Sequence, residues 1–129
     1  MSKPYIHAVS SAKKYGGVAE DYMAIHTLMD QSKSVIADGR HRALTHNTWF
    51  IEVIIPLIFG ETFGRESDDK IISSRDIAEQ HVAEDFGGFI PAATDYLLAM
   101  SFEDWMNNGL GGPPSWAKVI SSRKMRKID

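Results

Sequence analysis

Apolar residues recur along most of the chain at the spacing of an α-helix. Between residues 20 and 38 they return every three or four positions and form one stripe, which is typical of a helix with one buried face. In residues 40–59 the positions after Thr48 are apolar on nearly all sides, so we expect this second helix to be the most buried element. Pro56 lies inside it and is expected either to kink the helix or to end its regular part.

Capping and turn residues predict the remaining elements. Ser73 or Ser74 can cap a third helix that runs to Asp85, with Asp76 favourably placed in its first turn. Gly87 is expected to end this helix. The other predicted segments are a loop over residues 1–19, a polar loop over 60–70, a short extended piece at 71–72, a fourth helix over 91–100 that opens at Pro91, a short helix over 101–108, a Gly/Pro linker over 109–114 and a basic tail over 115–129.

Taken together, these elements predict a mainly α protein. We expect a compact single-domain helical bundle of four to five helices, with a loop-like N-terminus and a basic C-terminal tail. The chain has 129 residues, which is enough to bury a core without disulfides or a bound metal. The helical domain is expected to cover residues 1–108, and the linker and tail to cover residues 109–129.

Composition narrows the classes of site and partner. Cysteine is absent, which excludes disulfides, thiolate zinc sites and cysteine nucleophiles. The net charge is −3, so nucleic-acid binding is not expected, even though the tail is basic. The most apolar stretch, residues 49–59, is far shorter than the roughly 20 residues that span a bilayer. No secretory signal is visible, so we expect a cytoplasmic protein without a membrane partner.

Five histidines carry the candidate chemistry. His26 precedes Asp30 by four positions, and His81 precedes Glu84 and Asp85 by three and four, so each histidine shares a helix face with a carboxylate. Such a pair can supply two ligands to one metal ion. Alternatively, the carboxylate accepts a hydrogen bond from the histidine and orients its ring. The spacing matches no tight ligand signature such as HExxH, so solvated surface pairs are the competing interpretation.

The segment DGRHRALTH, residues 38–46, contains two more histidines. His41 and His46 are five positions apart, roughly 140° around a regular helix, and are therefore not expected to bind the same ion. We expect His41 to face the site. We expect His46 to face away from the ion, as a core residue or as a support to the ligands, together with Asp38 and Asp85.

Arg40 and Arg42 flank His41 in this segment. A guanidinium group matches the geometry of a phosphate or carboxylate, so the two arginines are candidates for an anion clamp. The alternative is that they are surface charges or partners of Asp38. The sequence does not decide between these interpretations.

Four blocks taken together resemble an uncharacterised family of small bacterial and bacteriophage proteins. The blocks are HAVSSAKKYGG, EDYMAIHTLMDQSK, DGRHRALTH and IAEQHVAEDFGGFIP, and the resemblance covers roughly residues 5–100. The family has no established activity, so the resemblance implies no reaction. It does add His7 to the candidate residues. The positions that carry the family's motifs are His7, Ser10, His26, Asp30, Ser32, Lys33, Asp38, Arg40, His41, Arg42, His46, Glu79, Gln80, His81, Glu84 and Asp85.

The first functional hypothesis is a helical domain that binds one divalent, zinc-like metal ion. An ion with an open position could activate water, which predicts a metal-dependent hydrolase of the phosphoesterase type acting on an anionic small molecule. Arg40 and Arg42 would then be the catalytic residues that steady the anion. The expected ligands are His26, His41 and His81, with Asp30 or Glu84 completing the shell and His7 as a substitute from the N-terminal loop.

The second hypothesis comes from another class of function. It is a non-enzymatic accessory or binding protein, phage or bacterial, in which the His/Asp/Arg blocks form a buried polar network that fixes the fold. A phage-encoded protein would act in the host cytoplasm. On this hypothesis the apolar helix over residues 49–59 is also expected to serve a homodimer.

Overall fold

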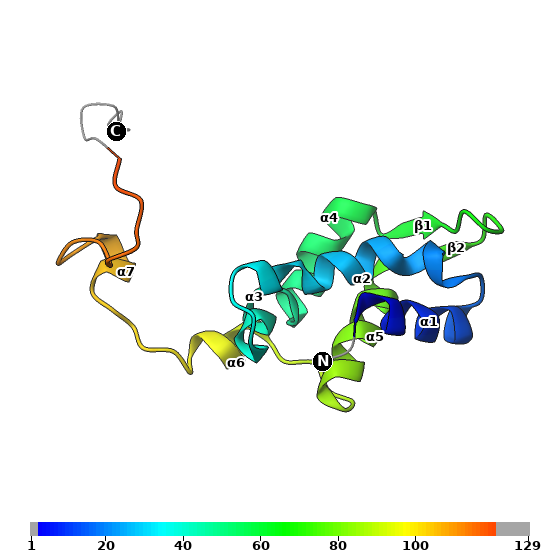
Figure 1. Ribbon diagram of the computed structural model, residues 1–129, viewed down its shortest axis with the longest axis horizontal. Helices are drawn as coiled ribbons and strands as arrows, with labels where there is room; N and C mark the ends of the chain where they lie inside the picture. The colour runs from blue at the N-terminus through cyan, green and yellow to red at the C-terminus, as the bar shows by residue number, and fades with distance from the viewer. Residues whose placement is uncertain (1–2, 121–129) are drawn as a thin grey trace. The chain divides into compact units, whose positions relative to one another are not determined.

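The computed structural model describes residues 3–120 and is shown in Figure 1. The contacts along the chain form two compact units, residues 1–99 and residues 100–129. Across the described residues there are seven α-helices, several shorter 3₁₀ and π turns and one two-stranded sheet. The mainly α class is therefore confirmed. The helices are shorter and more numerous than predicted, because the long helical stretches of the sequence are interrupted.

The N-terminal segment is a helix, so the loop predicted over residues 1–19 is wrong for most of its length. Helix α1 spans Pro4–Tyr15, begins with proline and ends at Gly16, whose positive φ of 96° turns the chain. Its buried residues are His7, Ala8 and Ser11. This face is polar or small rather than apolar, so hydrophobic periodicity did not reveal the helix.

The helix predicted over residues 20–38 is present in its central part. Helix α2 spans Met23–Asp30 and is preceded by the 3₁₀ turn η1 (Ala19–Tyr22) and followed by the 3₁₀ turn η2 (Gln31–Ser34). The predicted stripe is buried at Ile25 and Met29.

The helix predicted over residues 40–59 is broken in the middle. It consists of the 3₁₀ turn η3 (Gly39–His41), the single turn α3 (Arg42–Thr45), the π-helix η4 (Phe50–Ile54) and α4 (Ile55–Phe59). His46 leaves the helical conformation, with φ −101° and ψ 61°. The Asn47 side chain accepts a hydrogen bond from the Phe50 backbone N–H at 2.8 Å and so caps the helical segment that follows the break.

Only one side of this region is buried, which corrects the expectation that it is the most buried element. Phe50, Ile51 and Ile55 lie in the core, whereas Trp49 is 54% exposed and Leu57 is 75% exposed. Ile58, next to Leu57, is 56% exposed as well.

The third predicted helix is confirmed. Helix α5 spans Ser74–Phe86, the Ser73 side chain accepts a hydrogen bond from the Asp76 backbone N–H, and Gly87 ends the helix in the left-handed conformation. The extended piece predicted at residues 71–72 is also confirmed as strand β2 (Ile71–Ser73), which pairs antiparallel with β1 (Thr62–Gly64), Phe63 opposite Ile72. The partner strand lies in a segment predicted as a loop.

The fourth helix is shorter than predicted. Helix α6 spans Ala93–Leu97, and Pro91 precedes it instead of opening it. The Pro91 carbonyl accepts a hydrogen bond from the Thr48 backbone N–H at 2.9 Å, which ties this segment to the break after α3.

The described residues of the second unit, 100–120, include one short helix, α7, which spans Trp105–Asn108. Lys118 of the predicted basic tail is exposed. The other basic residues of that tail lie outside the described residues, and so does its end. No helix in residues 3–120 is long and apolar enough to cross a membrane.

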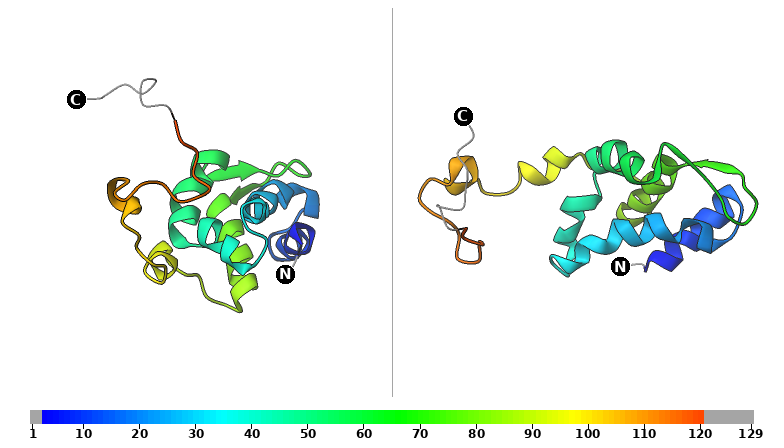
Figure 2. Two further views of the ribbon diagram at one scale, coloured as in Figure 1. Left: turned by 60° about the vertical axis from the view of Figure 1, so that its left-hand side comes forward. Right: turned by 90° about the horizontal axis from the view of Figure 1, so that it is seen from above.

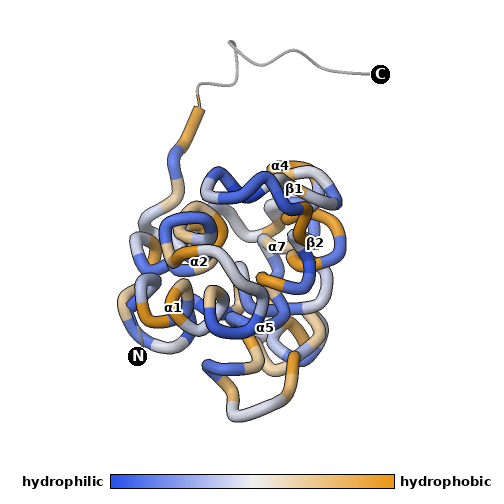
Figure 3. Tube along the Cα trace, turned by 90° about the vertical axis from the view of Figure 1, so that its right-hand side faces the viewer, coloured by the Kyte–Doolittle hydropathy of each residue, from blue (hydrophilic) through white to orange (hydrophobic). Residues whose placement is uncertain are grey.

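Helices α1, α2 and α5 pack against one another in the first unit, and α4 packs on α5, as Figures 1 and 2 show. Tyr22, Met29, Ile55 and Ile77 are completely buried in the core between them. The same helices also carry buried polar residues, and Figure 3 shows hydrophilic positions recurring along α2 and α5. The interior therefore has an apolar part and a polar part.

Candidate metal centre

All five histidines are buried in the polar part of the interior. His7 is 1% exposed and the other four are fully buried. Their rings form a continuous group, with centroid distances of 3.9 Å between His7 and His81, 5.1 Å between His26 and His81, 4.9 Å between His46 and His81, and 5.4 Å between His41 and His46. The group draws on α1, α2, η3, the break after α3, and α5, so folding brings all four sequence blocks together.

Four side chains in this group place one donor atom each around a common point. They are Asp30, His46, His81 and Asp85, and their donor atoms all lie within 4.8 Å of one another. Asp85 Oδ2 lies 2.9 Å from His46 Nε2 and 3.5 Å from His81 Nε2. Asp30 Oδ1 lies 3.8 Å from His46 Nε2 and 3.2 Å from His81 Nε2. Tetrahedral zinc with bonds of about 2.0–2.1 Å separates its donor atoms by about 3.3 Å, which lies in the middle of this range.

The hydrogen bonds of Thr45 fix the orientation of the His46 ring. The Thr45 hydroxyl donates its one proton to the Met29 carbonyl at 2.6 Å. His46 Nδ1 lies 2.8 Å from the same oxygen and must therefore be the donor of that contact. A neutral His46 is then protonated on Nδ1, and its Nε2 lone pair points toward Asp85 and Asp30.

A second chain of hydrogen bonds fixes His81 in the same way. The Ser11 hydroxyl donates its one proton to two carbonyl oxygens, that of the Gln80 side chain at 2.6 Å and that of the His7 backbone at 3.1 Å. It has no proton left for a third partner. His26 Nε2 lies 2.7 Å from Ser11 Oγ and must donate to it. A neutral His26 therefore accepts at Nδ1, so His81 Nδ1–H is the donor of the 2.8 Å contact between them. The His81 Nε2 lone pair is left facing the two carboxylates.

Two nitrogen lone pairs and two carboxylates thus face one another in a buried space. This arrangement is repulsive unless a cation or protons lie between the four donors. Asp30 Oδ2 is buried and has no hydrogen-bond partner among residues 3–120, and the Lys33 ammonium nitrogen is 3.6 Å away. Arg42 Nε is 3.8 Å from Asp85 Oδ2, also without a hydrogen bond. The donor set suits a divalent metal ion with nitrogen and oxygen ligands.

The pKa shifts follow from burial and from these contacts. Burial lowers the pKa of His26 to about 3, and the neighbouring His81 adds to the effect. Burial also lowers the pKa of His81, although Asp30 opposes the shift. Burial alone would raise the pKa of Asp85, but in the metal-free protein hydrogen bonds from the imidazoles of His46 and His7 outweigh it and hold that pKa well below its usual range, so protons then lie between the donors in place of a cation. The pKa of Asp30 is lowered for the same reason, chiefly by His81.

His7 lies on the other side of Asp85. Its Nδ1 is 2.8 Å from Glu84 Oε1, and its Nε2 is 3.2 Å from Asp85 Oδ1. Ser10 Oγ donates to the second oxygen of Glu84. Burial works against the charged form of His7, but the contacts with Asp85 and Glu84 outweigh it and raise the pKa of His7.

The structure arranges the predicted site residues differently from the expectation based on a regular helix. His46, which was expected to face away, contributes Nε2 to the four-donor group, because the chain leaves the helix at this residue. His41 Nδ1 instead contacts Ser32 Oγ at 2.7 Å. His26 contributes no donor atom to the group, because both its ring nitrogens are hydrogen-bonded.

The charged residues at the start of this segment lie at the surface. The Arg40 side chain is 77% exposed and forms an ion pair with Asp38 at 2.7 Å. This exposed pairing lowers the pKa of Asp38 to about 2. Arg42 is partly buried, and its guanidinium carbon lies 5.2 Å from the centre of the Phe86 ring. Only Arg42 of the two arginines reaches the four-donor group.

Two hydroxyl residues that orient the donors were not among the candidate residues. Ser11 holds His26, and Thr45 holds His46. Ser11 lies inside the HAVSSAKKYGG block, four residues after His7, so helical spacing would have placed it on the buried face of α1 had that helix been predicted.

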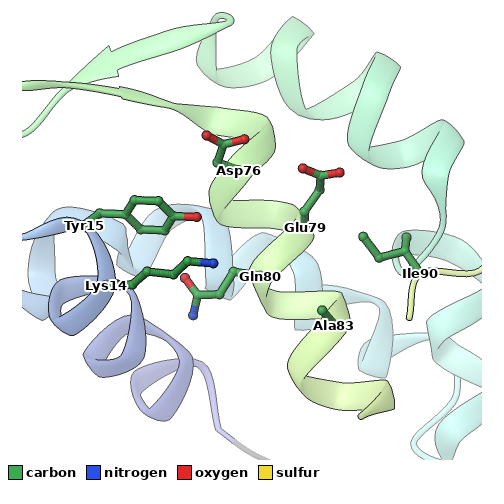
Figure 4. A pocket seen from close by; sticks show the side chains of 7 residues that line it. All are labelled: Lys14, Tyr15, Asp76, Glu79, Gln80, Ala83 and Ile90. Atoms are coloured by element: carbon green, nitrogen blue, oxygen red, sulfur yellow. The ribbon is translucent and has the colours of Figure 1, made fainter. Parts of the chain in front are cut away.

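A cavity of about 400 Å³ lies beside this centre and does not include the four donors. Figure 4 shows Lys14 and Tyr15 of α1 and the carboxylates of Asp76 and Glu79 on α5 around it. Gln80 also lines the cavity, and it is the residue that accepts from Ser11. The cavity therefore contacts the outer end of the hydrogen-bond chain that reaches His81.

Residues 2–106 match a family described as "Domain of unknown function (DUF6915)". The chain belongs to this family. The resemblance to an uncharacterised family is thereby confirmed, and the matched range contains the whole histidine group. No curated protein and no solved structure matches the chain.

Proposed function

We propose that this chain is a metal-binding helical domain in which Asp30, His46, His81 and Asp85 hold one divalent ion. The single observation that carries the proposal is the direction of the hydrogen bonds. Thr45 accepts a hydrogen bond from His46 Nδ1–H, and His26 accepts one from His81 Nδ1–H. The Nε2 lone pairs of His46 and His81 are therefore left facing two buried carboxylates. Metal-binding histidines characteristically donate their other N–H to an orienting group, as these two do.

Zinc is the metal that this donor set favours. The four donors are two imidazole nitrogens and two carboxylate oxygens, and the four histidine–carboxylate distances of 2.9–3.8 Å fit a tetrahedron. Magnesium and calcium prefer oxygen donors in larger numbers, so they are disfavoured. The two negative charges of Asp30 and Asp85 balance the charge of a divalent ion.

At this position we propose a structural role for the ion. Four protein donors complete a tetrahedral shell, which is typical of structural zinc sites, whereas a catalytic site keeps a position for water. The ligands come from α2, from the break after α3 and from α5, so the ion would join three segments that are distant in sequence. Hydrolysis, as predicted from the sequence, would need a further open position, and Arg40 points to solvent rather than toward this ion.

The competing function is a protein in which the same residues form a metal-free polar network. That network would have to hold extra protons on buried imidazoles next to Asp30 and Asp85. The two proposals predict different compositions of the purified protein.

The test is elemental analysis of tag-free protein by inductively coupled plasma mass spectrometry. After stripping with a chelator, the protein is titrated with Zn²⁺, and we expect at least one tightly bound ion per chain. His46→Gln and His81→Gln should each lose that ion, whereas Glu79→Gln, on the same helix α5 but facing the cavity of Figure 4, should keep it. Absence of any bound ion after metal is added back would refute the proposal and support the polar network.

A further inference from the structure

The second oxygen of Asp85 faces a histidine that the four-donor group does not use. Asp85 Oδ2 contacts His46 and His81, whereas Oδ1 lies 3.2 Å from His7 Nε2. Within the described part of the chain, His7 Nε2 is buried and has no hydrogen-bond partner. The carboxylate therefore lies between His7 on one side and His46 and His81 on the other. This is the position of a ligand that bridges two ions.

Glu84 determines which nitrogen of His7 carries a proton. Its Oε1 lies 2.8 Å from His7 Nδ1, and its other oxygen accepts from the Ser10 hydroxyl. An ionised Glu84 can only accept, so His7 Nδ1–H is the donor. Two flanking carboxylates favour a proton on His7 Nε2 in the metal-free protein, so a metal ion at this nitrogen has to displace that proton before the lone pair becomes a ligand. This carboxylate–histidine pair has the arrangement that orients metal-binding histidines in proteins.

The His7 ring lies against the ring of His81 in a tilted arrangement. The ring centroids are 3.9 Å apart with an interplanar angle of 31°, and both Nε2 atoms lie within 3.5 Å of an Asp85 oxygen. Two ions held by these imidazoles would share the Asp85 carboxylate, one at each of its oxygens. Paired metal ions bridged by a shared ligand in enzymes are about 3.5–4 Å apart.

We infer that the centre takes a second divalent metal ion, bound by His7 Nε2 and Asp85 Oδ1, with Asp85 bridging the two ions. This inference rests on the proposed function, because the first ion fixes Asp85 in place. The second ion has two protein donors, so water or an anionic ligand completes its shell.

The number of bound ions tests this inference on the full chain. Native mass spectrometry of metal-free protein titrated with Zn²⁺ should show two ions per chain at saturation, the second bound more weakly. His7→Asn keeps a donor near Nδ1 for Glu84 and removes Nε2, so it should bind one ion. Asp85→Asn should bind none, and the control Glu79→Gln should bind two.

A spectroscopic measurement on the unaltered protein covers the case in which His7→Asn does not fold. Two Mn²⁺ ions about 4 Å apart should give an exchange-coupled electron paramagnetic resonance spectrum, whereas a single ion gives the ordinary six-line signal. A saturation value of one ion without coupling would overturn the second site and leave the proposed function intact. Binding of no ion would overturn both, and two ions in His7→Asn would exclude His7 as the ligand.

Discussion

His26 and His81 share one hydrogen bond between their Nδ1 atoms, which are 2.8 Å apart in the interior. One residue comes from α2 and the other from α5, and 55 positions of sequence separate them. His26 accepts in this contact because its Nε2 donates to Ser11, so the bond sets which nitrogen of His81 faces Asp30 and Asp85. A histidine outside the four-donor group thereby positions a histidine that belongs to it.

Replacing His26 should weaken metal binding without removing a ligand. His26→Leu leaves a side chain that fills the site but cannot accept from His81, so His81 can rotate or change tautomer. Loss of such an orienting partner lowers metal affinity about 10–100-fold. Competition with a zinc chelator measures this change. Thr27→Ala, at an exposed neighbouring position on α2, is the control and should keep the wild-type affinity; equal affinities for the two variants would contradict the orienting role.

Zinc should stabilise the fold, because its ligands come from three separate segments. At a free zinc concentration 100 times the Kd, binding adds about 2.7 kcal/mol to the free energy of unfolding. For a chain of this size that corresponds to a rise in Tm on the order of 10 °C. Differential scanning calorimetry with zinc and then with chelator should show the rise and its reversal. In Asp85→Asn the melting temperature should not respond to zinc.

The metal-free protein should lose stability in acid through its buried histidines. Burial lowers the pKa of His26 from 6.5 to about 3, so between these pH values the unfolded chain binds a proton that the folded chain excludes. The stability from this group is therefore present above about pH 6.5 and declines as the pH falls toward 3, by up to about 1.4 kcal/mol per pH unit. Urea unfolding of chelator-treated protein at pH 7, 6 and 5 measures the slope.

His26→Leu provides the comparison for this pH dependence. It removes the titrating group, so its stability should depend less steeply on pH than that of the unaltered chain. Identical slopes would mean that the acid sensitivity arises elsewhere in the histidine group. His7, whose pKa is raised, acts in the opposite direction only above about pH 6.5, so it does not contribute to the slope between about pH 6 and 5.

The two arginines beside His41 should behave differently when each is replaced by alanine. Arg42 is partly buried, lies 3.8 Å from Asp85 and contacts the Phe86 ring, so Arg42→Ala should destabilise the metal-free protein by about 1–2 kcal/mol. Arg40 pairs with Asp38 at the surface, so Arg40→Ala should leave stability and zinc affinity unchanged. A loss of zinc affinity in Arg40→Ala would contradict this surface role and show that Arg40 contributes to the metal centre.

Gly17 should tolerate no side chain, for reasons independent of the metal. Its φ is +75°, and a Cβ atom there would lie 2.4 Å from an oxygen of Asp21 and 3.1 Å from the Arg65 side chain. Gly17→Ala should therefore lower the free energy of unfolding by about 1–3 kcal/mol. The number of zinc ions bound by the folded variant should not change. Gly87→Ala has positive φ but open space around it, and should be milder.

Local sequence signals predicted the elements that depend on nearby residues. A cap at Ser73 or Ser74 and the end of α5 at Gly87 follow from the sequence, because capping involves atoms within one turn of helix, and the structure has the cap at Ser73. Helix α1 was not predicted, because its buried face carries His7 and Ser11 and gives no apolar period. A polar face is buried only when partners from other segments satisfy it, and the sequence pattern does not contain those partners.

The sequence by itself determined the mainly α class, the ends of α5 and the histidine blocks on which the centre is built. The tertiary structure decided which donors meet. His46 joins Asp85 because the chain leaves the helical conformation at His46, and an angle of roughly 140° between His41 and His46 holds only on a regular helix. Helical spacing is a local property, whereas the direction of an imidazole lone pair depends on hydrogen bonds to Met29, Thr45 and Ser11 that only folding brings within reach.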